Sequence, residues 1–521
     1  MGPWNVYFIC KLVLHCAGSI QLHPWLNLGL AVALLVPLHA PLWRYLRQPA
    51  AIAAAAALLY YESFLPPWRS LLGEAGAVSG FSLDYLAELI TRIIDLRLTL
   101  WLLALIAGCL LLRHWLRISA FVLVALLVVP FLPRSPPGGT ATAAGSPAAA
   151  GATPRVVTND GGRLTTATGD AGLNQAVERF YSDEARRTLV FPRVTTNVDL
   201  IFIHVCSLAW DDLRAIGQEH HPLLGRFDVL YTHFNTAASY SGPAAIRLLR
   251  GTCGQAPHDA LYNTAAPECR LMDQLQQAGF QPQLLMNHDG HYGHFREDLE
   301  RRGGLEAAPQ PTAGARVAMR GFDGTAILED YDVLHGWWQR RLAAKEPRVA
   351  LYYNTISLHD GNRLPDAAGG WQRSYPRRAQ TLLDDIDRFL EELEASGARA
   401  IVVFIHEHGA AFHAARGEIA GLRQIPSPKV TDVPVGVRLV GLPVQAIQRP
   451  VRVDASVSYL GLNQLLANVM AAAGSDPGSI NLAQLLAHQH ATPFVAENDG
   501  LVVVRAGDGY YTRGPNGHWS P

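Results

Sequence analysis

The sequence has little charge and few cysteines for its length. Charged residues make up 17% of the 521 residues, and six residues are cysteine. Six cysteines in so long a chain exclude a scaffold built on disulfides. Lys and Arg (43) balance Asp and Glu (44), and this near-neutral total argues against a broad electrostatic nucleic-acid binder. The length suffices for about three domains, so the core needs no covalent support.

Charge is scarcest in residues 1–134, which hold 9 basic and 5 acidic residues. Five apolar stretches there approach the ~20 residues that cross a bilayer, although the third and fourth are short. Buried helices of a large soluble protein are the alternative, but five such stretches in 134 residues argue against it. We therefore predict an α-helical transmembrane bundle. Its expected spans are residues 4–20, 25–43, 49–65, 98–112 and 118–133.

The basic residues predict the orientation of this bundle. Arg44 and Arg47 lie between the second and third spans, and Arg113 and Arg117 lie between the fourth and fifth. The positive-inside rule places both loops in the cytoplasm. The N-terminus is then cytoplasmic, and everything after the fifth span lies outside.

Two further features of this region carry polar residues. Lys11 and His15 fall inside the first span, and we expect them to face the interior of the bundle. Residues 82–97 place apolar residues at helical spacing, which predicts an amphipathic helix on the outer membrane surface.

The rest of the chain is expected to form a linker and one external domain. Residues 135–154 contain only Ser, Pro, Gly, Thr and Ala, so we assign 135–172 to a flexible linker and 173–521 to the domain. Apolar runs alternate there with helical patterns, which favours an α/β domain around a mostly parallel sheet. A hairpin is expected over 500–513. The expected strands are 198–206, 227–234, 280–286, 348–357, 400–406 and 435–440, and the expected helices include 242–250, 269–278, 326–344, 377–395 and 459–472.

Candidate metal ligands follow two of the expected strands. Cys206 ends one strand, and Glu407 and His408 follow another, where Gly409 permits the strand to break. A thiolate, a carboxylate and an imidazole suit Zn²⁺ best. Each residue also has a plainer interpretation, because Cys206 could be a small core residue and His408 a hydrogen-bonded core histidine. His406 directly precedes the pair and could compete as a ligand.

The segment SYSGPA supplies a candidate nucleophile. Ser241 lies in the cap position or first turn of the expected helix 242–250, and Pro243 is tolerated there. A hydroxyl group at that place faces free backbone amides, which form a natural phosphate site. Capping is the commoner use of such a serine, and the motif alone does not separate the two roles.

Several motifs in this order resemble a known family. They are HVCSLAWDDL, SYSGPAAIRLLRGTCGQ, SLHDGN, the Glu407-His408-Gly409 turn and GLRQIPSPKVTDVPVGV. With the membrane bundle before them, they resemble the phosphoethanolamine transferases of the alkaline phosphatase/sulfatase superfamily, above all those that modify cellulose. The resemblance covers nearly the whole chain, and it implies an alkaline-phosphatase-like α/β domain.

The resemblance also implies a zinc centre. Cys206, Glu407 and His408 would bind one Zn²⁺, with Ser241 as nucleophile and further ligand. The relatives that modify lipid A usually show Glu for Cys206, Thr for Ser241 and Asp-His for the pair, together with several disulfides. This sequence lacks that pattern, which favours cellulose as the acceptor.

The implied reaction moves phosphoethanolamine from phosphatidylethanolamine to glucose 6-hydroxyls of cellulose. His359 of SLHDGN would contact the phosphoryl group or the leaving oxygen, and Arg423 and Tyr240 would bind phosphate or substrate. The resemblance places the protein in a bacterial inner membrane with its catalytic domain in the periplasm, next to cellulose synthase subunits. A hydrolase of the same superfamily and a non-catalytic scaffold stay open, although the sulfatase motif C/S-x-P-x-R is absent around Ser241.

The external cysteines give one more expectation. Three cysteines lie outside the expected spans, and an odd set in an oxidising compartment leaves one thiol over. With Cys206 held by the metal, we expect a disulfide between Cys253 and Cys269.

Overall fold

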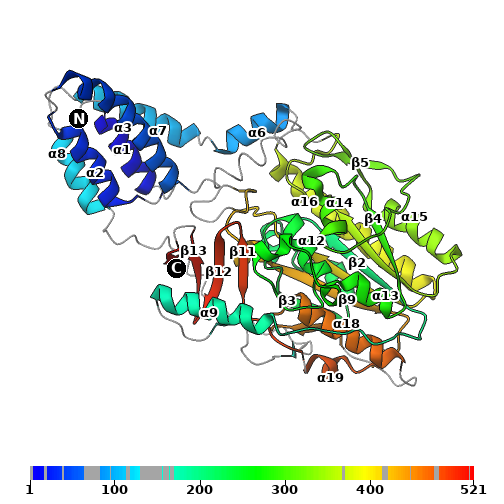
Figure 1. Cartoon of the computed structure of the whole chain (residues 1–521). Helices are drawn as coiled ribbons and strands as arrows, with labels where there is room; N and C mark the ends of the chain where they lie inside the picture. The colour runs from blue at the N-terminus through cyan, green and yellow to red at the C-terminus, as the bar shows by residue number, and fades with distance from the viewer. Residues whose placement is uncertain are drawn as a thin grey trace. The chain divides into compact units, whose positions relative to one another are not determined.

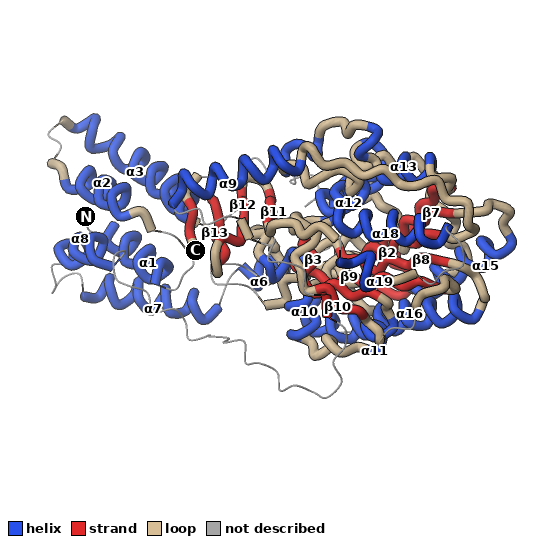
Figure 2. The backbone as a smooth tube through the Cα atoms, turned by 90° about the horizontal axis from the view of Figure 1, so that it is seen from below, coloured by secondary structure: helices blue, strands red, loops and turns tan. Residues whose placement is uncertain are grey.

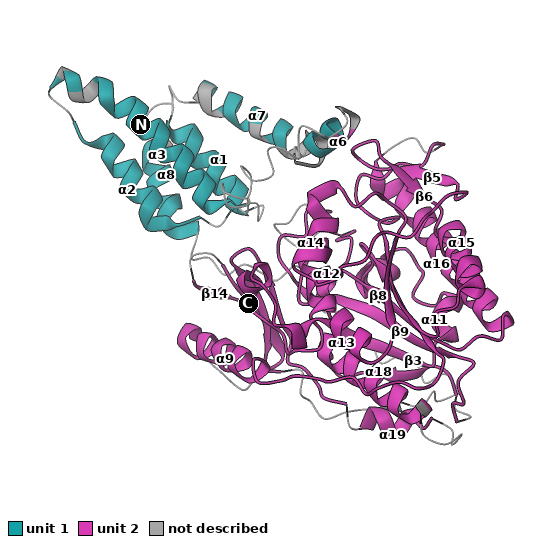
Figure 3. Ribbon diagram, turned by 45° about the vertical axis from the view of Figure 1, so that its right-hand side comes forward, with its two compact units in different colours: residues 1–78, 86–149, 414–420 teal, residues 79–85, 150–413, 421–521 magenta. Residues whose placement is uncertain are grey.

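The computed structural model of the chain contains two compact units, each described here by itself (Figure 3). The helical unit comprises residues 1–78, 86–149 and 414–420, and the α/β unit comprises 79–85, 150–413 and 421–521. The residues that the structure describes are 4–16, 20, 22–37, 40–63, 83–93, 96–112, 118–129, 155–156, 163–164, 169–366, 370–413, 420–445, 448–474, 480–487, 489–514 and 517–521.

Each of the five apolar stretches near the N-terminus forms a helix. These helices are α1 (Trp4–Cys16), α2 (Pro24–Leu35), α3 (Pro41–Glu62), α7 (Leu96–Leu112) and α8 (Ile118–Val128). Arg44 and Arg47, which we expected in a loop, lie within the first turns of α3. Over the described part of the chain, every helix falls short of the length or the apolar character needed to cross a bilayer.

The interior of the helical unit contains polar as well as apolar side chains. Lys11 and His15 are 1% and 3% exposed, as expected for side chains that face the interior. Lys11 forms an ion pair with Glu62, and its Nζ atom also donates to Asn27 Oδ1 at 2.7 Å. Large apolar side chains are exposed instead, among them Trp101 at 73% and Phe121 at 70%. The helical unit thus buries a polar cluster beside an apolar core and also exposes large apolar side chains.

The main sheet of the α/β unit contains all six expected strands. Its strand order is β1-β10-β3-β9-β8-β2-β7-β4, and only the pairs that involve β9 are antiparallel within it. The mostly parallel sheet of the prediction is thus confirmed. The strands are β1 (Arg155–Val156), β2 (Asp199–Val205), β3 (Val229–Asn235), β4 (Gln281–Met286), β7 (Val349–Thr355), β8 (Ala400–His406), β9 (Asp432–Val440) and β10 (Val451–Val453).

Helices cover both faces of this sheet because its central strands are apolar on both sides. In β2, Leu200 and Phe202 point into one core, while Ile201 and Ile203 point into the other. Figures 1 and 2 show the sheet between the two helical layers. One layer contains α12 (Ser241–Leu249), α13 (Leu271–Gln277), α14 (Phe295–Arg301), α18 (Tyr459–Gly474) and α19 (Leu482–Ala487). The other contains α10 (Trp210–Ala215), α11 (Pro222–Arg226), α15 (Asp330–Ala343) and α16 (Trp371–Ala395).

A second sheet lies at the C-terminal end of the chain. It is antiparallel, and its strands β12 (Leu501–Ala506) and β13 (Gly509–Arg513) form the expected hairpin. Helix α9 (Gly169–Glu184) packs against it through Phe180 and its apolar neighbours. Strand β1 and the first turn of α9 fall within the range expected as linker, so ordered structure begins before residue 173. The other strands of this sheet are β11 (Val495–Asn498) and β14 (Trp519–Ser520), and a separate small hairpin joins β5 (Val317–Arg320) and β6 (Ala326–Leu328).

Candidate metal centre and active site

Three neighbouring parallel strands bring the candidate residues to one edge of the sheet. Strand β2 lies between β8 and β7, and the register pairs Val205 with both His406 and Thr355. The carboxyl ends of the three strands therefore meet, which is where open α/β sheets bind ligands. Cys206 directly follows β2, and Glu407 and His408 directly follow β8.

Cys206, Glu407 and His408 form a compact group of buried ligand atoms. One sulfur, oxygen or nitrogen atom from each lies within 4.8 Å of the others, and all three residues are 0% exposed. His408 Nε2 lies 3.9 Å from Cys206 Sγ and 3.8 Å from Glu407 Oε2. Tetrahedral zinc with ordinary bond lengths holds neighbouring ligand atoms about 3.3–3.8 Å apart. The two distances lie at or just above the upper end of that range, so the spacing is close to what a single metal ion requires.

The hydrogen bonds of these residues also suit metal binding. His408 Nδ1 lies 2.8 Å from the carbonyl oxygen of Gly409. A carbonyl oxygen only accepts, so Nδ1 donates, and the lone pair of Nε2 faces the thiol and the carboxylate. Glu407 Oε1 accepts from Asn354, whereas the buried Oε2 has no hydrogen-bond partner among the described residues.

Burial disfavours the charged form of each of these three groups. It raises the pKa of the Cys206 thiol, with a further contribution from Glu407, and it raises the pKa of the Glu407 carboxyl group. Burial also lowers the pKa of His408 well below its usual range. A divalent cation would compensate a buried thiolate and carboxylate, which the neighbouring protein groups do not do fully. The chemistry of the donor set therefore fits a cation.

The backbone after each strand is held in an unusual conformation. Ser207 follows Cys206 with φ of 65°, a strained value for a residue with a side chain. Gly409 follows His408, and a Cβ atom there would lie 2.7 Å from the Cβ atom of Ala209. The Asp212 carboxylate accepts from the amides of Ala209 at 2.8 Å and Ala410 at 2.7 Å. It thereby ties the segments after β2 and β8 together.

Ser241 points at the metal ligands and does not cap its helix. It is the first residue of α12, the cap position belongs to Tyr240, and no side-chain cap hydrogen bond forms there. Ser241 Oγ lies 3.2 Å from His408 Nε2 and 3.4 Å from Cys206 Sγ. The capping alternative therefore fails in this structure, and the hydroxyl group is available for chemistry.

Arg423 and Tyr240 lie together beside this group. Arg423 is 7% exposed, and its Nε and Nη1 atoms donate no hydrogen bond to the described residues. Its guanidinium group lies 5.7 Å from the centre of the Tyr240 ring, and the Tyr240 hydroxyl donates to the carbonyl oxygen of Leu422 at 2.7 Å. A buried arginine with spare donors is suited to an oxyanion, and Tyr240 supports the loop that carries it.

His359 lies in the loop after β7. Its Nδ1 atom lies 2.7 Å from the carbonyl oxygen of Asp360 and therefore donates to it, which leaves Nε2 as an acceptor. Burial lowers the pKa of His359 to about 4, and the positive charge of Arg423 contributes. The imidazole is thus neutral at pH 7.

His406 lies outside the group of candidate ligands. Its Nδ1 atom donates to the carbonyl oxygen of Pro434 at 2.8 Å, and its ring packs on Phe404. Neighbouring residues of a strand point to opposite faces, and Glu407 is placed by the turn that follows. The metal-binding group found in the described part of the chain does not include His406.

Asn354 is a further residue of the site that the sequence analysis missed. Its Nδ2 atom donates to Glu407 Oε1 at 2.7 Å, and its Oδ1 atom lies 2.8 Å from His288 Nε2. It is fully buried on β7. The available signal was a lone amide in an otherwise apolar strand.

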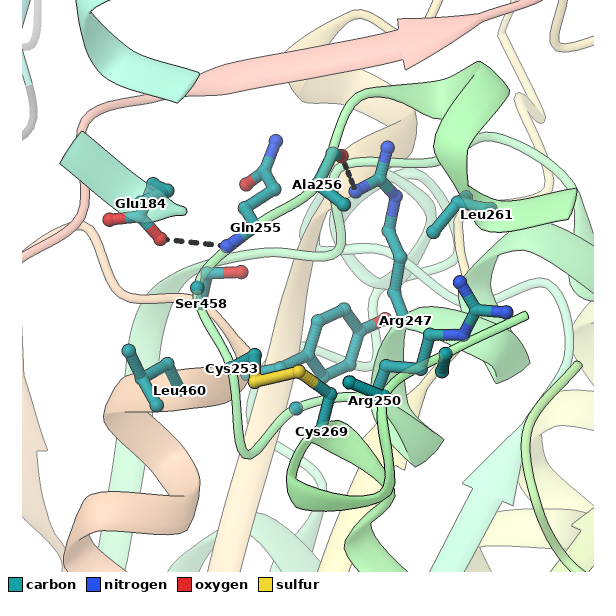
Figure 4. Close-up of a pocket in the computed structure, with 15 residues that line it drawn as sticks. Glu184, Arg247, Arg250, Cys253, Gln255, Ala256, Leu261, Cys269, Ser458 and Leu460 are labelled. Carbon is teal, nitrogen blue, oxygen red and sulfur yellow. Dashed lines mark hydrogen bonds between the residues drawn. A yellow bond between two sulfur atoms is a disulfide. The ribbon is translucent and has the colours of Figure 1, made fainter. Parts of the chain in front are cut away.

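The expected disulfide between Cys253 and Cys269 is present, and it lies away from the metal ligands. It lines a cavity of about 110 Å³ together with Arg247, Glu184 and other residues (Figure 4). Arg247 Nη1 donates to the carbonyl oxygen of Ala256 at 2.7 Å. The cavity includes none of the candidate site residues.

The sequence matches one protein family over both of its parts. Residues 4–131 match "Cellulose biosynthesis protein BcsG N-terminal domain", and residues 158–519 match the C-terminal domain of the same family. The "Cellulose biosynthesis protein BcsG" of Escherichia coli (strain K12) is 36% identical over 540 residues, which cover 100% of this chain and 96% of that protein. The protein of that name from Salmonella typhimurium (strain LT2) is 35% identical, with the same coverage.

Solved structures show more distant similarity. A protein in the alkaline phosphatase superfamily from Vibrio parahaemolyticus aligns with 67% of this chain and 87% of its own, at 13% identity and a TM-score of 0.48. The C-terminal periplasmic domain of EcEptC from Escherichia coli aligns with 60% of this chain and 93% of its own, at 13% identity and a TM-score of 0.43.

Proposed function

This chain belongs to the BcsG family of cellulose biosynthesis proteins, and on that premise we propose that it is a phosphoethanolamine transferase. Its donor would be phosphatidylethanolamine, its acceptor the glucose 6-hydroxyl groups of cellulose, and its covalent carrier Ser241. The observation that carries the proposal is the position of Ser241 Oγ, 3.2 Å from His408 Nε2 and 3.4 Å from Cys206 Sγ.

Cys206, Glu407 and His408 are the residues that would hold a zinc ion. When bound, zinc acts as a Lewis acid that lowers the pKa of a nearby hydroxyl group and neutralises charge on phosphoryl oxygens. Ser241 is close enough to be a further ligand. Asn354 keeps the carboxylate of Glu407 in place, as conserved outer partners of metal ligands commonly do.

In the first half of the reaction, Ser241 attacks the donor phosphorus. A bond forms between Ser241 Oγ and phosphorus, and the bond from phosphorus to the glycerol oxygen breaks. The proton that leaves the serine hydroxyl is the one that diacylglycerol requires, and His359 is the group that passes it on. Arg423 offers two spare donors to the phosphoryl oxygens.

In the second half, a sugar hydroxyl group attacks the phosphoserine. Neutral His359 takes the proton of that hydroxyl through Nε2, the bond from phosphorus to Ser241 breaks, and the proton returns to the serine. The carbonyl oxygen of Asp360 holds His359 in the tautomer that this step needs. The low pKa of His359 keeps the base unprotonated at neutral pH.

The direct test uses the full chain, a soluble chromogenic phosphoethanolamine ester and cello-oligosaccharides. We expect release of the chromogenic alcohol together with oligosaccharides that are heavier by one phosphoethanolamine group. Free phosphoethanolamine with unmodified sugar would identify a hydrolase instead. No release by a chain that contains zinc would favour the scaffold interpretation.

We also propose that the helical unit lies in the bacterial inner membrane and that the α/β unit lies in the periplasm. Three observations support this setting. The helical unit exposes large apolar side chains, and the Cys253–Cys269 disulfide suits an oxidising compartment. Tyr85 lies within the α/β unit, and two apolar segments separate it in sequence from the rest of that unit, so two crossings would return the chain to the same side.

A reporter that is active only in the periplasm, fused after Pro154, tests this topology. Activity at that position is expected, and activity only from a cytoplasmic reporter would overturn the topology. In this setting the donor lipid lies in the same membrane as the helical unit. The helical unit is also the part of the chain that would contact subunits of cellulose synthase.

A further inference from the structure

We propose that Tyr85 is a positioning residue of the active site, which fixes the loop that carries His359. Tyr85 belongs to the short segment 79–85 of the α/β unit, which resumes in the sequence only at residue 150, and it lies in α6 (Leu83–Ile93), between two of the apolar segments. The catalytic part of this inference rests on the proposed function, and the packing does not.

Tyr85 is buried within the α/β unit and bonded to the neighbour of His359. The side chain is 7% exposed, and its hydroxyl group donates to Asp360 Oδ2 at 3.3 Å. Asp360 is itself 5% exposed. A tyrosine of a surface helix would have its hydroxyl group in solvent, so this burial indicates a specific contact.

The Tyr85 ring occupies space that only a glycine leaves open. Gly361 adopts a φ of 77°, and a Cβ atom built there would lie 2.5 Å from Tyr85 Cε2 and 2.8 Å from Phe322 Cβ. The close approach and the left-handed backbone both require glycine. The chain at 360–361 thus fits against the ring of Tyr85.

Two routes lead from Tyr85 to His359. The first runs through the backbone, because the Asp360 carbonyl oxygen accepts from His359 Nδ1 while the Asp360 carboxylate accepts from Tyr85. The second runs through Phe322, whose ring centre lies 5.5 Å from that of Tyr85 and 5.1 Å from that of His359. Phe322 is 3% exposed, so these rings pack without solvent between them.

The consequence is that the part of the α/β unit from residue 150 onward does not contain the active site in full. A fragment that begins after the linker lacks Tyr85 and leaves the loop at 359–361 without its packing partner. The segment that joins the apolar helices would thereby set the efficiency of the chemistry, and cutting it away would weaken catalysis without removing any residue that touches the substrate.

The test compares three variants of the full chain on the chromogenic ester. Tyr85→Ala removes the ring and the hydroxyl, and we expect kcat to fall about 10-fold or more with KM and zinc content unchanged. Tyr85→Phe keeps the ring, so we expect it to recover most of that loss. Ile90→Ala is the matched control on the same helix, because Ile90 is 56% exposed, and it should behave as the parent.

Two further measurements separate positioning from a general loss of stability. The effects of Tyr85→Ala and Asp360→Ala on kcat should not add in the double variant, since each removes the hydrogen bond between these two side chains. Amide hydrogen exchange of the peptide 356–363 should be faster in Tyr85→Ala than in Ile90→Ala.

Unchanged kcat in Tyr85→Ala, or unchanged exchange at 356–363, would overturn the inference. Loss of zinc or of folding in Tyr85→Ala, with Tyr85→Phe no better, would reduce Tyr85 to a structural residue. A parent chain that turns over no ester, but whose exchange responds as expected, would overturn the proposed function and leave the packing of Tyr85 standing.

Discussion

The two units bury ionisable groups in opposite ways. In the helical unit, Lys11 and Glu62 form an ion pair that neutralises itself, and Asn27 hydrogen-bonds to both. In the α/β unit, the Cys206 thiol and the Glu407 carboxyl group lie beside the imidazole of His408, and burial raises the pKa of both acidic groups. The charges of the first group balance each other. Burial disfavours the charged forms of the second group, and the proposed zinc ion would supply the positive charge that these ionised forms need.

The surfaces of the two units also differ. Exposed large apolar side chains concentrate in the helical unit, whereas the α/β unit buries its apolar residues in two large cores. The hydrophobic effect dictates the second arrangement in water. The first is stable where lipid surrounds the protein, as in the membrane setting that we propose for the helical unit.

Removal of a metal ligand should have the largest effect. Cys206→Ser replaces a soft thiolate with a poor neutral ligand, so zinc content should fall and activity should drop by orders of magnitude. Cys16→Ser is the matched control, because Cys16 is a free and exposed cysteine of the helical unit. Elemental analysis of both purified variants decides the matter. Equal zinc in the two would remove Cys206 from the site.

A charged residue placed on the surface of each unit tests whether lipid surrounds the helical unit and water surrounds the α/β unit. Leu103 in the helical unit is 56% exposed and Leu342 in the α/β unit is 51% exposed. Leu103→Arg should oppose membrane insertion by about 3 kcal/mol, whereas Leu342→Arg should change stability by about 0.5 kcal/mol or less. The fraction that resists alkaline carbonate extraction measures the first effect. Equal behaviour of the two variants would contradict the comparison.

Removal of the disulfide should have a smaller effect, which is confined to the α/β unit. Replacing both Cys253 and Cys269 by Ala opens a loop with a sequence separation of 16 residues. Loops of this size contribute about 3 kcal/mol to stability. Thermal unfolding of the α/β unit should shift down, while zinc content at moderate temperature stays the same. A fall in zinc content at full folding would tie the disulfide to the metal centre.

The pH dependence gives the smallest expected effect. The lowered pKa of His359, about 4, keeps the imidazole neutral at neutral pH, and the base is lost only as pH falls through about 4. The rate with saturating ester should therefore change little between pH 8 and about pH 5.5. Zinc content measured at each pH is the control. A fall in rate centred near pH 6.5 with constant zinc would show that His359 titrates as an exposed histidine.

Much of the sheet could be predicted because its strands are apolar on both faces, as β2 and β8 show by their complete burial. The grouping of Cys206, Glu407 and His408 could be predicted because each of them follows such a strand. The antiparallel position of β9 could not, since strand order depends on contacts that are distant in sequence.

Contacts between side chains that are far apart in the sequence could not be predicted either. Asn354 reaches Glu407 across 53 residues and Tyr85 reaches Asp360 across 275, and no local pattern marks such pairs. Strand β1 was missed because two residues leave no periodicity. Arg44 and Arg47 were placed in a loop because charge was taken to end a helix, while α3 begins before them at Pro41.

The mass of the reaction intermediate tests the central claim most directly. The full chain, mixed briefly with the chromogenic phosphoethanolamine ester and quenched in acid, should gain the mass of one phosphoethanolamine group, and peptide sequencing should place it on Ser241. Ser241→Ala should stay folded, gain no mass and lose turnover by orders of magnitude. Turnover by Ser241→Ala near the parent rate, or an adduct on another residue such as Ser239, would contradict the account.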